Sequence, residues 1–291
     1  MVRVGSTHRH RRLIVNADDY GLSGGVNTGI IEAAERGVVT STSMMVNLAG
    51  FDDAVTLVRS ARSLSVGLHF NLTTGKPLTT AASLARPSTG AFYPLTSLLT
   101  RASLGLIHAA EVRQECVAQI DRLLEAGIQP THIDSHRHVH AHPVLWTAVL
   151  EAGASRNIHT VRVPSEPLWA NPRDWRASLK KIGLLIVARL SRQQVRHNFP
   201  DHFFGISLQG GRSFASRLFG LIPKLPPGTS ELMTHPGYSD SALAEHDDYT
   251  WQREEELTVL CSTGLRDLLE RSDIELVSFG DQPSHRTTRV S

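Results

Sequence analysis

The sequence predicts an α/β fold that closes into an irregular (β/α) barrel. Short runs rich in β-branched and apolar residues alternate with longer helical patterns over most of the 291 residues. Such alternation is typical of a parallel sheet with crossover helices, and seven or eight strand–helix units in one domain suit a barrel. An open doubly wound sheet is the alternative, although no Gly-x-Gly-x-x-Gly motif follows the first strand.

The expected elements follow one another in this rhythm. Strands are predicted at Leu13–Ala17, Thr40–Val46, Ser65–Leu72, Thr131–Ser135, Thr160–Val163, Ser230–Thr234 and Ile274–Phe279. Several helical patterns end at a glycine, which is a common helix stop. Helices are predicted at Gly25–Arg36, Asp52–Ala61, Glu111–Ala126, Pro143–Ala152 and Tyr249–Glu270.

Two segments interrupt the alternation, Thr74–Ser103 and Trp169–Pro227. Long loops in barrels usually build or cover the active site, so we expect both to contribute to substrate recognition. We expect a basic N-terminal tail at 1–12, a single barrel domain at 13–281 and a C-terminal tail at 282–291.

Composition excludes several classes of protein. With 41% hydrophobic and 20% charged residues the chain is globular, and a net charge of +2 without a long basic tract argues against a nucleic-acid partner. The segment before Arg12 lacks the apolar run of a secretory signal. Cys116 and Cys261 have no Cys or His at metal spacing, so reduced thiols and a cytoplasmic location are expected.

A basic helix is predicted at 176–197, around the apolar run Gly183–Ala188. This run is far shorter than the ~20 residues that span a bilayer, so no stable membrane insertion is expected. The segment is interpreted either as a packed helix or as one that lies on a membrane surface or covers a lipid tail.

The first predicted strand ends in two adjacent carboxylates, Asp18 and Asp19. Active sites of parallel α/β folds lie at this end of the strands. Because side chains alternate along a strand, the two carboxylates should start in different directions, so one could bind a metal while the other acts as a base. A capped strand-to-helix turn is the alternative.

Histidines follow three further strands. His69 lies near the end of the third predicted strand, with Asn71 on the same face, where it could position a substrate or a loop. His235 ends the strand before Pro236 and Gly237. Each histidine alone is a weak signal, but an Asp and two His at one barrel mouth would leave metal positions open for water, which suits hydrolysis.

The strongest signal is the histidine-rich segment His132–His142. If it is extended, residues 132, 134, 136, 138 and 140 share one face, which then carries four imidazoles and one carboxylate. Imidazole is a common transition-metal ligand, and a neighbouring carboxylate often fixes its tautomer. A solvated His-rich loop is the alternative.

At these positions the chain resembles the YdjC-like family of carbohydrate deacetylases. The matching segments, in order, are Asn16–Gly21, Gly67–Thr73, His132–His140, Val161–Pro164 with Glu166, and His235–Gly237. Departures are small, because Tyr20 replaces a common Phe and Arg137 a common His. The two interruptions match only loosely. The resemblance implies an irregular (β/α) barrel of the glycoside hydrolase/deacetylase type, and its members include enzymes that act on chitooligosaccharides and a hopanoid-biosynthesis branch.

The resemblance also implies a set of site residues. A divalent metal, Mg²⁺ or Zn²⁺, would bind Asp19, His69 and His136; Asp18 would be the catalytic base and His235 the acid. Substrate contacts are expected from Asn71, Arg162, Tyr20 and His138. Arg162 could orient Asp18, bind a substrate hydroxyl or pair with Glu166. Trp169, Trp175, Phe203 and Phe204 could stack on a sugar or pack in the core.

These residues predict a metal-dependent hydrolase that removes an acetyl group from an N-acetylated sugar or sugar-lipid. The protein could act as a homodimer. A metal-dependent phosphoesterase and a non-catalytic carbohydrate- or metal-binding protein of the same fold are the rival hypotheses. Binding alone would need neither a base nor an acid, and the chain has candidates for both in Asp18 and His235.

Overall fold

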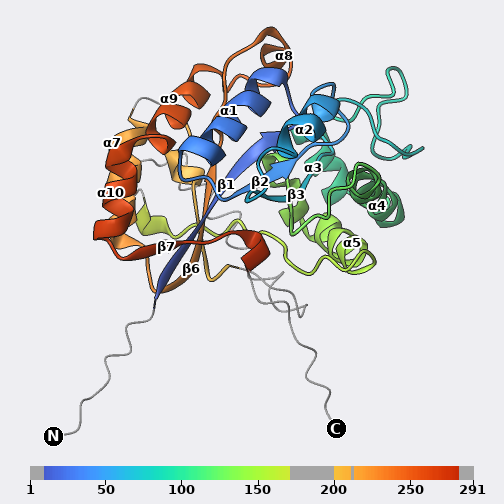
Figure 1. The fold of residues 1–291 in the computed structure, drawn as a ribbon. Coiled ribbons are helices and arrows are strands. Elements are labelled where there is room, and N and C mark those ends of the chain that lie inside the picture. Colours follow the sequence, from blue (N-terminus) through green and yellow to red (C-terminus); the bar gives the residue numbers. More distant parts are fainter. Residues whose placement is uncertain (1–9, 171–199, 211–212, 282–291) are drawn as a thin grey trace, which may run out of the picture.

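A curled parallel sheet forms the centre of the molecule (Figure 1). The computed structural model describes residues 10–170, 200–210 and 213–281. Among these residues, seven strands form one sheet in the order β4-β3-β2-β1-β6-β5, and β7 also pairs with β1. The strands are β1 (Arg11–Tyr20), β2 (Ser41–Met44), β3 (Ser65–Phe70), β4 (Ile133–Ser135), β5 (His202–Phe204), β6 (Gly228–Thr234) and β7 (Ile274–Leu276).

Strand β1 organises the sheet, because it pairs with three other strands. β6 runs beside it from Arg11 to Ala17, so β7 and β2 share its opposite edge, first at Arg11–Leu13 and then at Asn16–Tyr20. Beyond β4 the sheet continues through a single parallel bridge between Ile133 and Val161. The predicted α/β fold with an irregular parallel barrel is therefore confirmed, and the sheet curls into a half-barrel.

Helices pack around the outside of this sheet (Figure 1). They are α1 (Gly24–Arg36), α2 (Phe51–Val58), α3 (Leu95–Ser103), α4 (Ala109–Glu125), α5 (Pro143–Ala154), α7 (Phe214–Leu221), α8 (Ser241–Ala244), α9 (Trp251–Leu260) and α10 (Thr263–Arg271). The long helix predicted at Tyr249–Glu270 is wrong, because the chain breaks into α9 and α10. Ser262 is the cause: its hydroxyl accepts a hydrogen bond from Leu265 N and caps a new helix.

The two faces of the sheet differ in polarity. Leu13, Val15 and Ala17 of β1 belong to the large hydrophobic cluster shared with the helices. The alternate residue Asn16 instead donates hydrogen bonds to Asp18 and to Ser43 of β2. The inner face of the curl thus holds a hydrogen-bonded polar layer, and the apolar core lies outside it.

Both predicted interruptions contain regular structure. Helix α3 lies in the first, together with an antiparallel bridge between Ala85 and Phe92. The second contains β5, α7 and two short 3₁₀ helices, Ile206–Leu208 and Ile222–Lys224. These elements are too short to show a helical or strand period in the sequence. The predicted basic helix at 176–197 and Trp175 lie outside the described residues.

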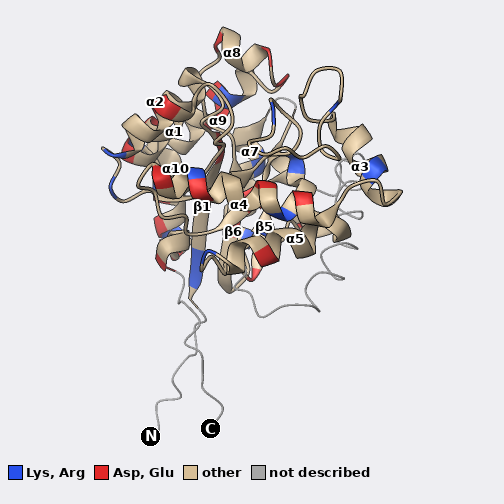
Figure 2. Ribbon diagram, turned by 90° about the vertical axis from the view of Figure 1, so that its right-hand side faces the viewer, with Lys and Arg blue, Asp and Glu red and all other residues tan. Residues whose placement is uncertain are grey.

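Charged residues are distributed along the outer helices (Figure 2). Both signs are present on α4, whereas α5 carries only the acidic Glu151. No helix in the described part of the chain is both long enough and apolar enough to cross a bilayer.

Candidate metal and active site

Three predicted ligands meet at the carboxyl ends of the strands. Oδ1 of Asp19 lies 2.9 Å from Nδ1 of His136 and 3.1 Å from Nε2 of His69. One ligand atom from each residue lies within 4.8 Å of the other two, and all three residues are buried. The cluster could therefore hold a metal ion.

A local distortion of β1 brings both of its carboxylates to this point. The register with β2 shifts between Ala17 and Tyr20, and Asp19 adopts a left-handed backbone with φ of 71°. Strict alternation would send Asp18 and Asp19 to opposite faces, but both line the same pocket. The prediction that they diverge is therefore corrected by this irregularity.

The histidine-rich segment is not extended, which overturns one prediction. Strand β4 ends at Ser135, and His136–Ala141 forms short 3₁₀ turns on either side of a kink, where Arg137 and His138 both have a φ of 57°. His136 and His138 still line the pocket. The imidazole of His140 contacts the Ser135 hydroxyl and the Arg162 carbonyl, away from the ligand cluster.

His69 lies between two carboxylates. Its Nε2 faces Asp19, and its Nδ1 lies 2.7 Å from Oδ1 of Asp134. Burial lowers the pKa of His69, but the two carboxylates outweigh it and raise that pKa to about 10. For Asp19 the same two effects have opposite signs. Burial raises its pKa, but the positive charges of Arg253 and His136 outweigh burial and hold that pKa well below its usual value.

Asp18 is fixed by Arg162, which is one of the roles predicted for that arginine. The guanidinium donates from Nη1 to Oδ2 of Asp18 at 2.6 Å and from Nη2 to Oδ1 at 2.7 Å. Glu166, the other predicted partner, accepts hydrogen bonds from the backbone N–H groups of Gly205 and Ser207. Such a bidentate pair fixes both the position and the plane of the Asp18 carboxylate.

The pocket above these residues has a volume of about 300 Å³. His235 reaches it from the end of β6, and its Nε2 lies 3.3 Å from Nε2 of Gln209. The pocket is lined by Asp18, Asp19, His69, Leu95, His136, Arg137, His138, Gln209, Met233, His235, Asp247 and Tyr249. The predicted ligands, base, acid and His138 therefore share one cavity.

Three of the four predicted substrate contacts do not line the pocket. Arg162 is fully buried behind Asp18, and Tyr20 and Asn71 lie elsewhere. The hydroxyl of Tyr20 is buried and donates to the carbonyl of Ala54. Asn71 donates to the Thr74 carbonyl and accepts from Thr73 N, so it holds the following loop, which was the second role considered for it. Neither residue lines the pocket. Of the aromatic candidates, Phe203 is buried and Trp169 packs against Phe204.

Helix α9 supplies two residues that contact the site and that sequence reasoning missed. Arg253 donates from Nη2 to Asp19 at 2.7 Å and to Asp247 at 2.7 Å. Glu256, one turn later, accepts from His235 N and from the Tyr249 hydroxyl. Because Arg253 and Glu256 are three residues apart, the sequence places them on the same face of a helix. A charged helix face is usually exposed to solvent, however, so this spacing alone did not indicate a role in the site.

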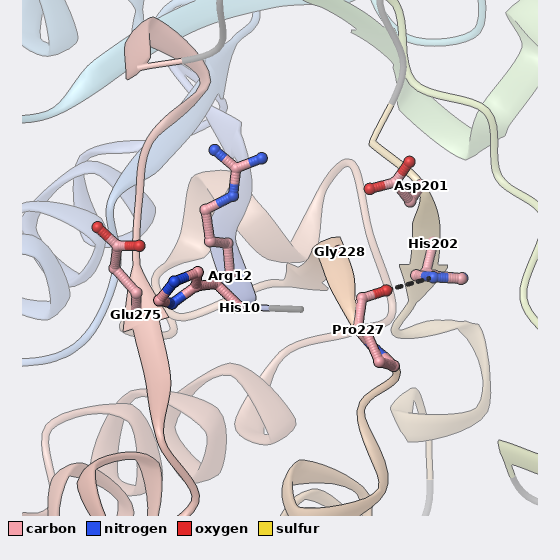
Figure 3. Close-up of a pocket in the computed structure, with 7 residues that line it drawn as sticks. All are labelled: His10, Arg12, Asp201, His202, Pro227, Gly228 and Glu275. Carbon is pink, nitrogen blue, oxygen red and sulfur yellow. Dashed lines mark hydrogen bonds between the residues drawn. The ribbon is translucent and has the colours of Figure 1, made fainter. Parts of the chain in front are cut away.

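A second cavity, of about 640 Å³, opens at the opposite end of the strands (Figure 3). Arg12 of β1 points into it between Glu275 and Asp201, and His202 binds the Pro227 carbonyl at its edge. Within the described residues, the groups spaced for a metal ion all lie at the other end of the barrel.

Comparison with known proteins identifies the family of the chain. The family model described as YdjC-like protein matches residues 12–271. The chain belongs to the YdjC-like family. A protein of Brevibacillus brevis called carbohydrate deacetylase is 36% identical over 272 residues, which cover 93% of this chain and 99% of that protein. A protein of the same name from Geobacillus stearothermophilus is 37% identical over 92% of this chain and 97% of its own length.

Among solved structures, a protein of Enterococcus faecalis V583 described as a cellobiose-phosphate cleavage protein superposes with a TM-score of 0.77. It is 26% identical, and the alignment covers 93% of this chain and 98% of that one. The family resemblance proposed from five separated motifs thus extends over nearly the whole chain.

Proposed function

We propose that this YdjC-like protein is a metal-dependent carbohydrate N-deacetylase, which hydrolyses the acetamido group of an N-acetylated sugar. One observation carries the proposal: the Asp19–His69–His136 cluster lies in the same pocket as Asp18 and His235. The relatives called carbohydrate deacetylase support this choice of substrate class. Their high coverage supports extending the assignment to the whole chain.

The three side chains fit a divalent cation by their chemistry. Two imidazoles and one carboxylate leave coordination positions open, which is typical of catalytic rather than structural sites. Asp134 binds the second nitrogen of His69, as carboxylates commonly do behind a ligating histidine. The nitrogen donors favour Zn²⁺, and Mg²⁺ is the alternative. When bound, the ion would polarise a water molecule and the acyl oxygen.

The remaining residues have roles that follow from their positions. Asp18 takes the proton of the attacking water, because it lines the pocket and Arg162 holds its carboxylate in a fixed orientation. The water oxygen bonds to the acyl carbon, and the carbon–nitrogen bond then breaks. His235 gives a proton to the departing nitrogen, so the products are acetate and a free amine.

The proposal is tested by measuring acetate release from a panel of N-acetylated monosaccharides, chitooligosaccharides and N-acetylated glycolipids. We expect activity on at least one of them, its loss with a chelator and its recovery when Zn²⁺ or Mg²⁺ is restored. A simple phosphate monoester in the same panel tests the phosphoesterase hypothesis. Turnover of the phosphate ester alone, or undiminished acetate release after complete metal removal, would overturn the assignment.

The glycolipid members of the panel also test the alternative of a lipid-linked substrate. A variant in which 176–197 is replaced by a short Gly/Ser linker is compared with the wild type on a glycolipid and a short chitooligosaccharide. Selective loss on the glycolipid would support a lipid-contacting role for that segment. Equal losses, in a folded and metal-loaded variant, would refute it.

A further inference from the structure

The guanidinium of Arg162 is surrounded by three carboxylates in the interior of the barrel. Besides the two bonds to Asp18, its Nη1 lies 2.8 Å from Oδ2 of Asp134, and its Nε donates to Oε1 of Glu231 at 2.6 Å. All four side chains are almost completely buried. One cation thus faces three acidic groups where water cannot screen them.

Two of the three carboxylates have evident further tasks. Asp18 lines the pocket, and Asp134 also binds His69 and the hydroxyl of Ser43. Glu231 differs from both, because its Oε2 has no hydrogen-bond partner among the described residues. Burying a carboxyl group with one oxygen unpaired is costly, so the contact with Arg162 is the feature that accounts for an acid at this position.

The arrangement around the guanidinium is directional. Glu231 accepts on the Nε edge, and Asp18 accepts at both terminal nitrogens. The guanidinium carbon lies over the ring of Phe203, 5.5 Å from the ring centroid. Because a guanidinium is planar and rigid, fixing its Nε edge also fixes the direction in which the terminal nitrogens point.

We propose that Glu231 is a positioning residue, which holds Arg162 in the orientation that aligns both oxygens of Asp18. Glu231 comes from β6 and sits opposite Ile14 of β1 in the ladder, so a rigid strand supplies the anchor. The inference rests on the proposed function, in which Asp18 is the base. It predicts that Glu231 affects the chemical step without touching substrate or metal.

The test compares Glu231→Met, which keeps the length but removes the acceptor, with Glu231→Gln, which keeps an acceptor and removes the charge. We expect Glu231→Met to lower kcat by on the order of 10²-fold, because misplacement of a catalytic group by about 1 Å has that effect. Its KM and metal content should stay unchanged, and Glu231→Gln should restore most of kcat. If Glu231 only stabilised the fold, Glu231→Met would lower the melting temperature and leave kcat of the folded protein unchanged.

A second measurement is independent of turnover. The Nε–H of Arg162, assigned in the ¹⁵N spectrum by its absence in Arg162→Lys, should exchange slowly with solvent in the wild type and rapidly in Glu231→Met. Unchanged protection, or wild-type kcat in Glu231→Met, would overturn the inference. Failure of the proposed function is recognised separately, because Asp18→Asn would then be fully active or the wild type would release no acetate from any substrate.

Discussion

Asp19 and His136 are 117 residues apart in the chain, yet Oδ1 of one lies 2.9 Å from Nδ1 of the other. The contact joins the end of β1 to the first residue after β4, across the mouth of the barrel. His69 is the third member of this cluster. The predictions about metal content and metal affinity below depend on it.

Purified protein should contain about one divalent ion per chain, and His136→Ala should lose it. An open site with three protein ligands cannot easily spare one of them. Metal content measured by elemental analysis checks this expectation. His108→Ala is the matched control, because the side chain of His108 is 70% exposed and far from the cluster in the chain. Full occupancy in His136→Ala would refute the ligand assignment.

Asp18→Asn should keep the metal and lose most of the activity. The amide preserves the shape of the carboxylate but cannot take a proton, and a general base contributes roughly 10²–10⁴-fold. Steady-state kcat and metal content, measured on the same preparation, check the two halves of the expectation. Turnover at the wild-type rate would place the base on another residue.

Asp134→Asn should weaken metal binding even though Asp134 is not a proposed ligand. Its carboxylate accepts from Nδ1 of His69 and so directs Nε2 toward Asp19. Loss of such a partner typically lowers metal affinity or activity by about 10- to 100-fold. Calorimetric titration of the metal-free protein measures the effect, with Asp121→Asn on the outer surface as control. Equal affinities in the two variants would contradict it.

The metal-free protein should lose stability in acid partly through His132. Burial lowers the pKa of this histidine from 6.5 to about 3. Between about pH 6.5 and pH 3 the histidine is protonated in the unfolded chain but neutral in the folded chain. The free energy of unfolding therefore falls as the pH drops through this range, by up to about 1.4 kcal/mol per pH unit. The free energy of unfolding, measured with urea between pH 7 and pH 4, should therefore depend less steeply on pH in His132→Gln than in the wild type.

Two controls make that comparison specific. His108→Gln, which changes an exposed histidine, should retain the pH dependence of the wild type. Because His140 is also buried, with a pKa lowered to about 4, the slope in His132→Gln should decrease without disappearing. A slope identical to that of the wild type would mean that His132 becomes protonated in the folded protein.

The positions of site residues could be predicted from the sequence where these residues directly follow a strand or belong to a local motif. Asp18, Asp19, His69 and His235 follow apolar runs, so their common position at the strand ends could be predicted from the rule for parallel sheets. His136 also lies in the cluster, but not on an extended strand as predicted: the strand stops one residue before it, and a kinked run of 3₁₀ turns follows.

Contacts that depend on packing could not be predicted in this way. Arg253 and Glu256 are charged residues that become buried when α9 packs against the barrel mouth. Glu231 becomes buried when β6 takes its place in the sheet beside β1. In the sequence they look like residues of solvated faces. Tyr20 shows the opposite error, because this residue follows Asp18 and Asp19 directly but points its hydroxyl at α2 and away from the pocket.

The left-handed backbone of Asp19 affects how amino-acid replacements among relatives should be interpreted. Asp and Asn tolerate this conformation better than most residues, and Gly adopts it without strain. A lineage that had given up catalysis would thus still be under selection for Asp, Asn or Gly at this position. Retention of Asp19 in a distant homologue is accordingly weaker support for an active enzyme than retention of His69 together with His136, whose backbones impose no such restriction.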